Sequence, residues 1–152
     1  MDLAVFRRAP LFTELSDRQL TALAAIARPE TYKAGDSIFK EGDPGDRLFL
    51  IAEGAVRISR VVPGAGEEAI AVLQAGACFG EMAVLDRPDR STDAIANRST
   101  TVWAIGQPEL DLVLEADHEL GYRFLRALVR QLSRRLGAAN DQVRAVLAMA
   151  MF

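Results

Sequence analysis

The pattern of hydrophobic and polar positions along the chain changes its period twice. Near the N-terminus, leucine and isoleucine recur at helical spacing from Leu20 to Ile26. Ser16 precedes this stretch and has the capping-box relation to Gln19, in which each side chain accepts a hydrogen bond from the other residue's backbone N–H. The sequence therefore predicts a helix that follows Ser16 and ends at about Ala27.

Beyond this helix, seven glycines between Gly35 and Gly76 separate short apolar segments. This rhythm is typical of an antiparallel β-barrel or jelly roll. The Pro-Gly-Ala-Gly sequence at 63–66 predicts a hairpin turn. We expect Trp103 in the core. The expected strands include residues 48–51, 56–62, 68–73, 91–97 and 100–105.

The C-terminal third returns to the helical period. Pro108 favours the start of a short helix that runs through Leu114, and Asp117 has the position of an N-cap for a long helix over about 118–149. One sector of this long helix is apolar and could form a coiled-coil-like seam for a homodimer, or could pack on its own barrel. The apolar positions are Leu128, Leu132, Leu136, Ala139, Val143, Val146 and Ala150. A different sector carries Arg123, Arg126, Arg130, Arg134 and Arg144.

The chain has 152 residues and a mass of 16.5 kDa, which suits one ordinary core. We expect a single domain over 1–152, with the barrel at about 28–106 and the C-terminal helices at about 108–150. The expected fold class is α+β, an antiparallel β-barrel or jelly roll flanked by an N-terminal helix and C-terminal helices. Met1 and the complete set of elements favour a self-standing protein over the sensory part of a longer one.

Charge narrows the classes of partner, and cysteine content bears on the cellular compartment. The formal net charge is −3 and the pI about 5.2, which opposes binding to nucleic acid or to an anionic membrane. The basic residues concentrate from Glu119 onward, where the chain has six arginines and two acids. Cys78 is the single cysteine, and the sequence shows neither a signal peptide nor an apolar run long enough to span a bilayer. We therefore expect a cytoplasmic protein.

Residues 79–91, with the sequence Phe-Gly-Glu-Met-Ala-Val-Leu-Asp-Arg-Pro-Asp-Arg-Ser, combine a sharp turn with a helix start. Gly80 permits the turn. The backbone N–H groups of Glu81, Met82 and Ala83 can then point together at an anion, aided by the positive end of the helix dipole. This segment predicts an anion-binding loop.

Two charged side chains define the chemistry of that loop. Arg90 supplies a countercharge for a phosphate, whereas Glu81 would be repelled by one and is suited to accept a hydrogen bond from a nearby hydroxyl. A ribose 2′-OH beside a cyclic phosphate meets both requirements. Ser91 could bond a phosphate oxygen or a purine, or could be an ordinary strand serine. The alternative for Glu81 and Arg90 is a tight turn with a surface ion pair.

This loop resembles the phosphate-binding cassette of the cyclic nucleotide-binding domain family, found in catabolite activator protein, protein kinase A regulatory subunits and nucleotide-gated channels. The glycine-punctuated stretches 33–43 and 46–58 resemble the family's early strands, so the similarity spans about residues 10–150. The resemblance implies a non-catalytic sensor that binds cAMP, or less favourably cGMP, and needs no metal or other cofactor.

The resemblance also implies a base pocket with walls at Ile58, Ile70, Ala71 and Leu73. Ala71 and Ala139 depart from catabolite activator protein, where the corresponding positions carry hydroxyl groups that bond the adenine, so base selectivity stays open. Asn140 could replace a lost contact, or could be a solvated helix residue.

Arg135 differs from the other arginines of the long helix, because it projects from the apolar side near Phe124 and Leu128. An arginine there needs a partner, and Glu81 is the natural candidate. The resemblance implies that the helix passes the ribose at Arg135. The alternative is a snorkelling side chain, which extends its charge to solvent.

Three classes of function compete. The sensor would relay ligand binding through movement of its C-terminal helices to an unknown downstream protein. A metal enzyme of the cupin kind would need two or three histidines, and His118 is the single histidine. A ligand-independent interaction module, or the regulatory domain of a larger channel or transcription regulator, is the remaining alternative. The sequence shows no DNA-binding helix-turn-helix after residue 150.

Overall fold

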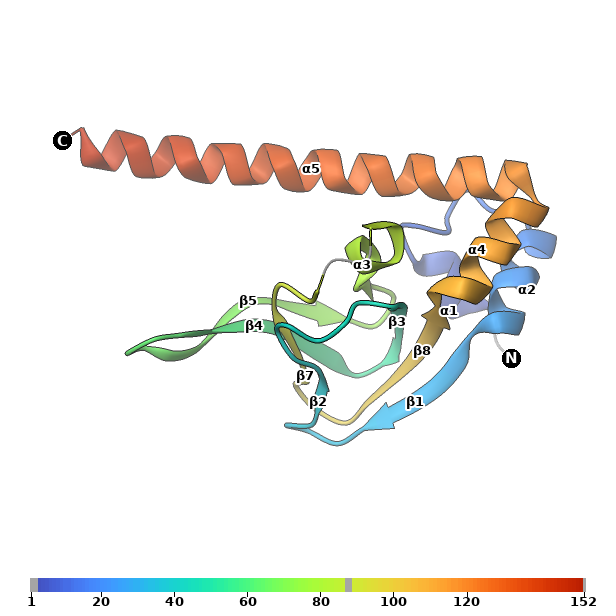
Figure 1. The fold of residues 1–152 in the computed structure, drawn as a ribbon, viewed down its shortest axis with the longest axis horizontal. Coiled ribbons are helices and arrows are strands. Elements are labelled where there is room, and N and C mark those ends of the chain that lie inside the picture. Colours follow the sequence, from blue (N-terminus) through green and yellow to red (C-terminus); the bar gives the residue numbers. More distant parts are fainter. Residues whose placement is uncertain (1–2, 87–88, 152) are drawn as a thin grey trace.

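The computed structural model describes residues 3–86 and 89–151, except for the side chains of Ala83 and Val84. Within this part, two antiparallel sheets lie beneath a set of helices, and one long helix crosses the molecule (Figure 1). The helices are α1 Ala4–Arg8, α2 Asp17–Ile26, α3 Glu81–Asp86, α4 Gln107–Ala116 and α5 His118–Ala150. The strands are β1 Arg28–Tyr32, β2 Ser37–Phe39, β3 Arg47–Glu53, β4 Ala55–Val62, β5 Gly66–Gln74, β6 Cys78–Phe79, β7 Asp93–Ala96 and β8 Thr100–Gly106.

The strands form two four-stranded sheets with the orders β1-β8-β3-β6 and β2-β7-β4-β5. Every pairing within them is antiparallel. The β4–β5 hairpin turns at Pro63–Gly66, where Ala65 donates to the Val62 carbonyl over 3.0 Å, as the glycine pattern predicted. The sandwich, with helices from the N-terminal and C-terminal parts of the chain packed together beside it, confirms the predicted α+β jelly roll.

Two apolar clusters hold the layers together. One lies between the sheets and includes Phe49 and Phe79, whose rings stack with centroids 4.9 Å apart. The other joins the sheet of β1, β8, β3 and β6 to the helices, through residues such as Phe12 and Phe124. Trp103 is only partly buried and packs on the edge of this second cluster, against Phe6. The clusters fix the position of α5 relative to the barrel.

Both predicted helix caps are present. Ser16 and Gln19 make the reciprocal bonds of a capping box at α2. Asp117 caps α5 by accepting a hydrogen bond from the Leu120 backbone N–H over 3.1 Å. This bond stabilises the ionised carboxyl and holds the pKa of Asp117 below its usual value. Among the described residues, none of the helices is long and apolar enough to cross a membrane.

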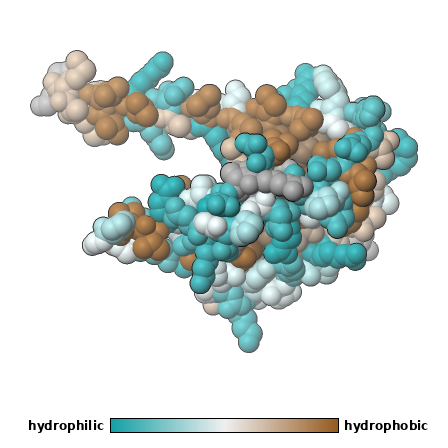
Figure 2. All heavy atoms as spheres, viewed as in Figure 1, coloured by the Kyte–Doolittle hydropathy of each residue, from teal (hydrophilic) through white to brown (hydrophobic). Residues whose placement is uncertain are grey.

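The apolar seam of α5 differs from the predicted one at its N-terminal end. Leu128 is buried in the core that joins α5 to the barrel, so at this position the alternative of packing on the barrel holds. On the N-terminal side of Leu132, the exposed apolar strip follows the helix face next to that of Leu128. It consists there of Tyr122, Leu125 and Val129. Residues 133–151 are all exposed, and in Figure 2 the distal half of α5 stands clear of the β4–β5 hairpin below it.

The cap of α5 yields a stability prediction. We expect Asp117→Ala to lower the free energy of unfolding by about 1 kcal/mol, because the first turn loses its acceptor. Urea unfolding followed by circular dichroism measures the change. Asp141→Ala, within the exposed part of the same helix, should not lower stability. Equal losses in both variants would contradict the role of the cap.

Candidate functional site

A pocket of about 610 Å³ opens between the β4–β5 hairpin, the start of α3, the segment before β7 and one side of α5. A cavity of this size is typical of small-molecule sites. The structure brings most of the candidate residues together around it. Those that line it are Ile58, Ile70, Ala71, Leu73, Gly80, Glu81, Met82, Arg90, Ser91 and Arg135.

Arg90 is the most unusual group in the pocket, because its guanidinium is buried without an ion-paired carboxylate among the described residues, although Asp43, Asp46 and Glu81 attract it at longer range. Its side chain stacks over the Phe39 ring, 4.2 Å from the centroid, and the residue is 7% exposed. Its terminal nitrogens donate to the carbonyl oxygens of Gly80 and Arg47 over 3.2 and 2.8 Å. Nε has no partner, and no carboxylate of the described residues forms an ion pair with this arginine.

Burial of this cation has an electrostatic consequence. Desolvation lowers the pKa of Arg90, although a guanidinium stays protonated at physiological pH. A buried positive charge costs free energy unless a negative group compensates it. The pocket is therefore electrostatically prepared for an anionic ligand beside Arg90.

Gly80 allows the chain to pass close to this guanidinium. Its φ of +77° lies in the left-handed region, which a glycine adopts without strain. A Cβ at this position would lie 2.7 Å from Nη1 of Arg90 and 3.0 Å from the Arg47 carbonyl oxygen. Conformation and close packing thus both require glycine here.

Glu81 is the first residue of α3 and is 2% exposed. Its Oε1 accepts hydrogen bonds from the guanidinium of Arg135 and, over 3.2 Å, from the side-chain amide of Gln131. The predicted contact between Glu81 and Arg135 is therefore confirmed. These bonds join α3 to α5 at the edge of the pocket.

The apolar wall comes from the β4–β5 hairpin. Ile58 and Leu73 are partly buried, whereas Ile70 and Ala71 are exposed toward the pocket opening. Ala139 and Asn140 do not line the pocket: they lie on the exposed distal part of α5, because the helix runs straight on past Arg135. The backbone of Ala83 belongs to α3, but its side chain lies outside the described part, as do residues 87 and 88 of the loop.

Sequence reasoning missed several contributors to the site. Phe39 forms the platform under Arg90, and Phe79, Asp89 and Thr92 also line the pocket. Gln131 was missed as the second donor to Glu81. Its spacing of four residues from Arg135 put both side chains on one helix face, so this partner was available from the sequence.

Comparison with known proteins shows the family. The sequence model of the cyclic nucleotide-binding domain matches residues 29–117. The chain belongs to this family, a class of regulatory domains with a jelly-roll fold.

Related proteins support this assignment. The chain is 28% identical to the CRP-like cAMP-activated global transcriptional regulator of Mycobacterium tuberculosis over 86% of its own length and 58% of the relative. It is 35% identical to Glutaminase 1 of Bradyrhizobium diazoefficiens over 88% of its own length, but over only 21% of that protein. The chain thus spans between about a fifth and three-fifths of these curated relatives.

Solved structures agree with the fold. The Thermus thermophilus catabolite activator protein superposes with a TM-score of 0.82 and 30% identity, covering 91% of this chain and 63% of that one. The N-terminal domain of a Streptomyces coelicolor transcriptional regulator gives a TM-score of 0.80 and 35% identity, covering 89% of this chain and 94% of that domain.

The geometry at Gly80 can be tested by comparing two glycines with similar backbone angles. Gly64 has a φ of +81° and no atoms within 4 Å of a Cβ built on it, so Gly64→Ala should cost only the conformational strain of about 1–2 kcal/mol. Gly80→Ala should lower the free energy of unfolding by at least about 1 kcal/mol more, because it also displaces Arg90. Equal losses in chemical denaturation would contradict the packing described.

Proposed function

We propose that the chain is a non-catalytic sensor that binds cAMP, with cGMP as the less favoured ligand, in the pocket beside Arg90. The observation that carries the proposal is the buried guanidinium of Arg90, which within the described residues has an unused donor and no ion-paired carboxylate. A cyclic phosphate would compensate this charge through charge-assisted hydrogen bonds. Membership of a regulatory domain family supports a role without catalysis.

The remaining walls suit the rest of a cyclic nucleotide. Glu81 lies at the start of α3 and can accept a hydrogen bond from a ribose hydroxyl through Oε2, because Oε1 already has its donors. Ile58, Ile70 and Leu73 offer an apolar surface for the base. Ala71 offers no hydroxyl to the purine, so this wall does not distinguish adenine from guanine.

The relay would use the connection between α3 and α5. A ribose hydroxyl at Oε2 would share the Glu81 carboxylate with the bonds that Gln131 and Arg135 make to Oε1, so the contact between α3 and α5 would differ in strength between the free and bound states. A ligand shifts a conformational equilibrium only through such differential contacts. We propose that α5 passes this change to a downstream protein.

A homodimer through α5 completes the proposal. Nine positions from Tyr122 to Ala150 alternate spacings of three and four residues, which is the heptad repeat of a coiled coil. Most of the large residues among them are exposed, including Val129 at 64% and Val143 at 57%. In Figure 2 apolar side chains follow the exposed length of this helix. A second copy would cover them. The seam positions are Tyr122, Leu125, Val129, Leu132, Leu136, Ala139, Val143, Val146 and Ala150.

The phosphate assignment predicts the effect of removing one charge. We expect Arg90→Ala to weaken cAMP binding at least about tenfold in isothermal titration calorimetry, because a charge-assisted hydrogen bond contributes about 1.5–3 kcal/mol. Arg28→Ala, an exposed arginine on β1, serves as the matched control and should bind like the unmodified chain. A loss below tenfold for Arg90→Ala would defeat the assignment, and absence of saturable cAMP binding in the unmodified chain would favour the interaction module.

The dimer predicts a change of mass. We expect light scattering to give twice the chain mass of 16.5 kDa, and Val143→Glu to shift the protein toward the monomer because a carboxylate would be buried in the seam. Ala148→Glu lies on the opposite side of α5 and should leave the dimer intact. A monomeric unmodified chain at micromolar concentration would contradict this part of the proposal.

A further inference from the structure

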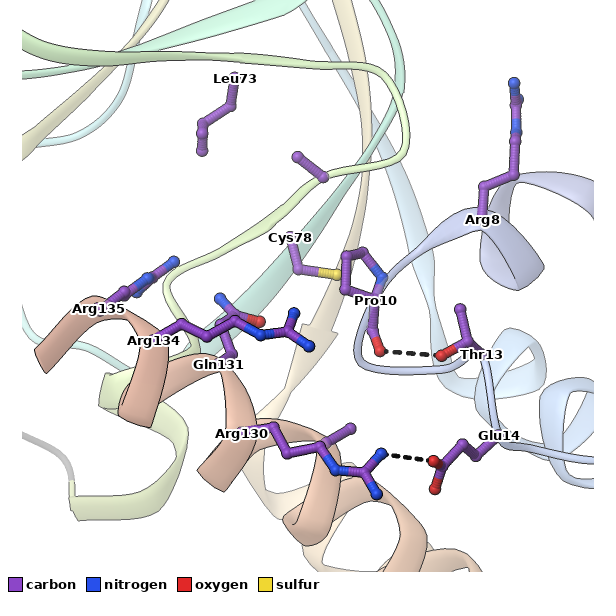
Figure 3. Close-up of a pocket in the computed structure, with 12 residues that line it drawn as sticks. Arg8, Pro10, Thr13, Glu14, Leu73, Cys78, Arg130, Gln131, Arg134 and Arg135 are labelled. Atoms are coloured by element: carbon purple, nitrogen blue, oxygen red, sulfur yellow. Dashed lines mark hydrogen bonds and ion pairs between the residues drawn. The ribbon is translucent and has the colours of Figure 1, made fainter. Parts of the chain in front are cut away.

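A second cavity, of about 500 Å³, adjoins the nucleotide pocket and shares Leu73 and Arg135 with it. Its walls come from the loop between α1 and α2, the residues around Cys78, and α5 (Figure 3). Its volume falls in the range of small-molecule sites. Arg130 and Arg134, which line it, lie on the flank of α5 away from the heptad seam, so a dimer through that seam would leave the cavity open.

The cavity has an apolar floor and a cationic rim. Pro10, Ala77, Cys78 and Ala127 supply apolar lining, and burial raises the pKa of the Cys78 thiol, so the floor carries no thiolate. Four arginines line the same space. This combination of apolar surface and concentrated positive charge is what an organic anion requires.

The arginines differ in whether their charge is already satisfied. Arg130 pairs with Glu14 over 2.6 Å, and Arg135 pairs with Glu81. Arg134 has no ion-pair or hydrogen-bond partner among the described residues, and in Figure 3 its guanidinium extends from α5 toward Pro10. Arg8 lines the opposite wall, but its guanidinium points away from α5 (Figure 3). Within the described part of the chain, Arg134 is thus an unpaired cation that extends from α5 into this space, with Arg130 beside it.

We propose that this cavity binds a small organic anion, with an apolar body on the floor and a phosphate or carboxylate at Arg134 and Arg130. A planar guanidinium can bind either group through two parallel hydrogen bonds. Glu14 competes with the ligand for Arg130 and so limits the affinity of the cavity for the anion.

The site is connected to the nucleotide pocket by shared residues. Leu73 and Arg135 line both cavities, and Gln131 lines the second cavity while donating to Glu81. An anion at Arg134 attracts the neighbouring guanidinium of Arg135 away from Glu81. The uncompensated carboxylate then opposes a phosphate nearby, so occupation of one site weakens binding at the other. This coupling rests on the proposed nucleotide function, whereas the anion site itself does not.

Calorimetric titration of the full chain without nucleotide tests the site. The probes are phenyl phosphate, 3-phenylpropanoate and the uncharged 3-phenylpropanol, so the first two distinguish phosphate from carboxylate and the third reports apolar binding alone. We expect saturable binding of at least one anion and much weaker binding of the alcohol. Equal binding of all three, or no saturation by either anion up to about 10 mM, overturns the proposal.

Two variants are expected to change the affinity for the anion in opposite directions. Arg134→Gln should weaken anion binding about tenfold, and Glu14→Gln should strengthen it because Arg130 is released. Arg144→Gln, on the exposed distal part of α5, should change nothing. Unchanged binding in Arg134→Gln, or an equal loss in Arg144→Gln, overturns the assignment to this cavity.

The coupling has its own readout. Saturating anion should weaken cAMP binding about fivefold or more, cAMP should weaken anion binding by the same factor, and Arg135→Gln should remove the effect. An unchanged cAMP affinity overturns the coupling. If the chain binds no cyclic nucleotide at all, the anion titrations still decide the site independently.

Discussion

The buried guanidinium of Arg90 is the constraint on which the rest of the pocket depends. It is held between an aromatic platform at Phe39 and two backbone carbonyls, and no carboxylate of the described residues forms an ion pair with it. The chain must approach it closely, which only Gly80 permits. A protein core rarely retains such a charge unless another group compensates it. The proposed cyclic phosphate is that group.

The same pocket is connected to the longest helix through one carboxylate. Glu81 is buried at the start of α3, and both of its side-chain donors, Gln131 and Arg135, come from α5. The same helix exposes an apolar heptad seam from Tyr122 onward, and its distal part leaves the barrel. One element therefore carries both a connection to the ligand pocket and a surface for assembly, which is the arrangement a sensor requires.

The sequence predicted the helices, caps and turns better than the tertiary contacts that their side chains make. The caps at Ser16 and Asp117, the hairpin at 63–66 and the long helix are local features, and all are present. For Leu128 the sequence left open a dimer seam or packing on the barrel, because helical periodicity cannot tell which of two adjacent apolar faces meets the barrel. The structure places it against the barrel. The platform at Phe39 was missed for a similar reason, since its contact with Arg90 joins segments that are distant in sequence.

Arg90 itself can report whether it receives the phosphate. The side-chain Nε–H resonance of Arg90, assigned by its loss in Arg90→Lys, can be followed by nitrogen-15 NMR during titration with cAMP. The account predicts that this resonance moves and saturates together with the calorimetric binding curve, because a new anion lies beside the guanidinium. An Nε–H signal that stays unchanged while cAMP saturates the protein would contradict it.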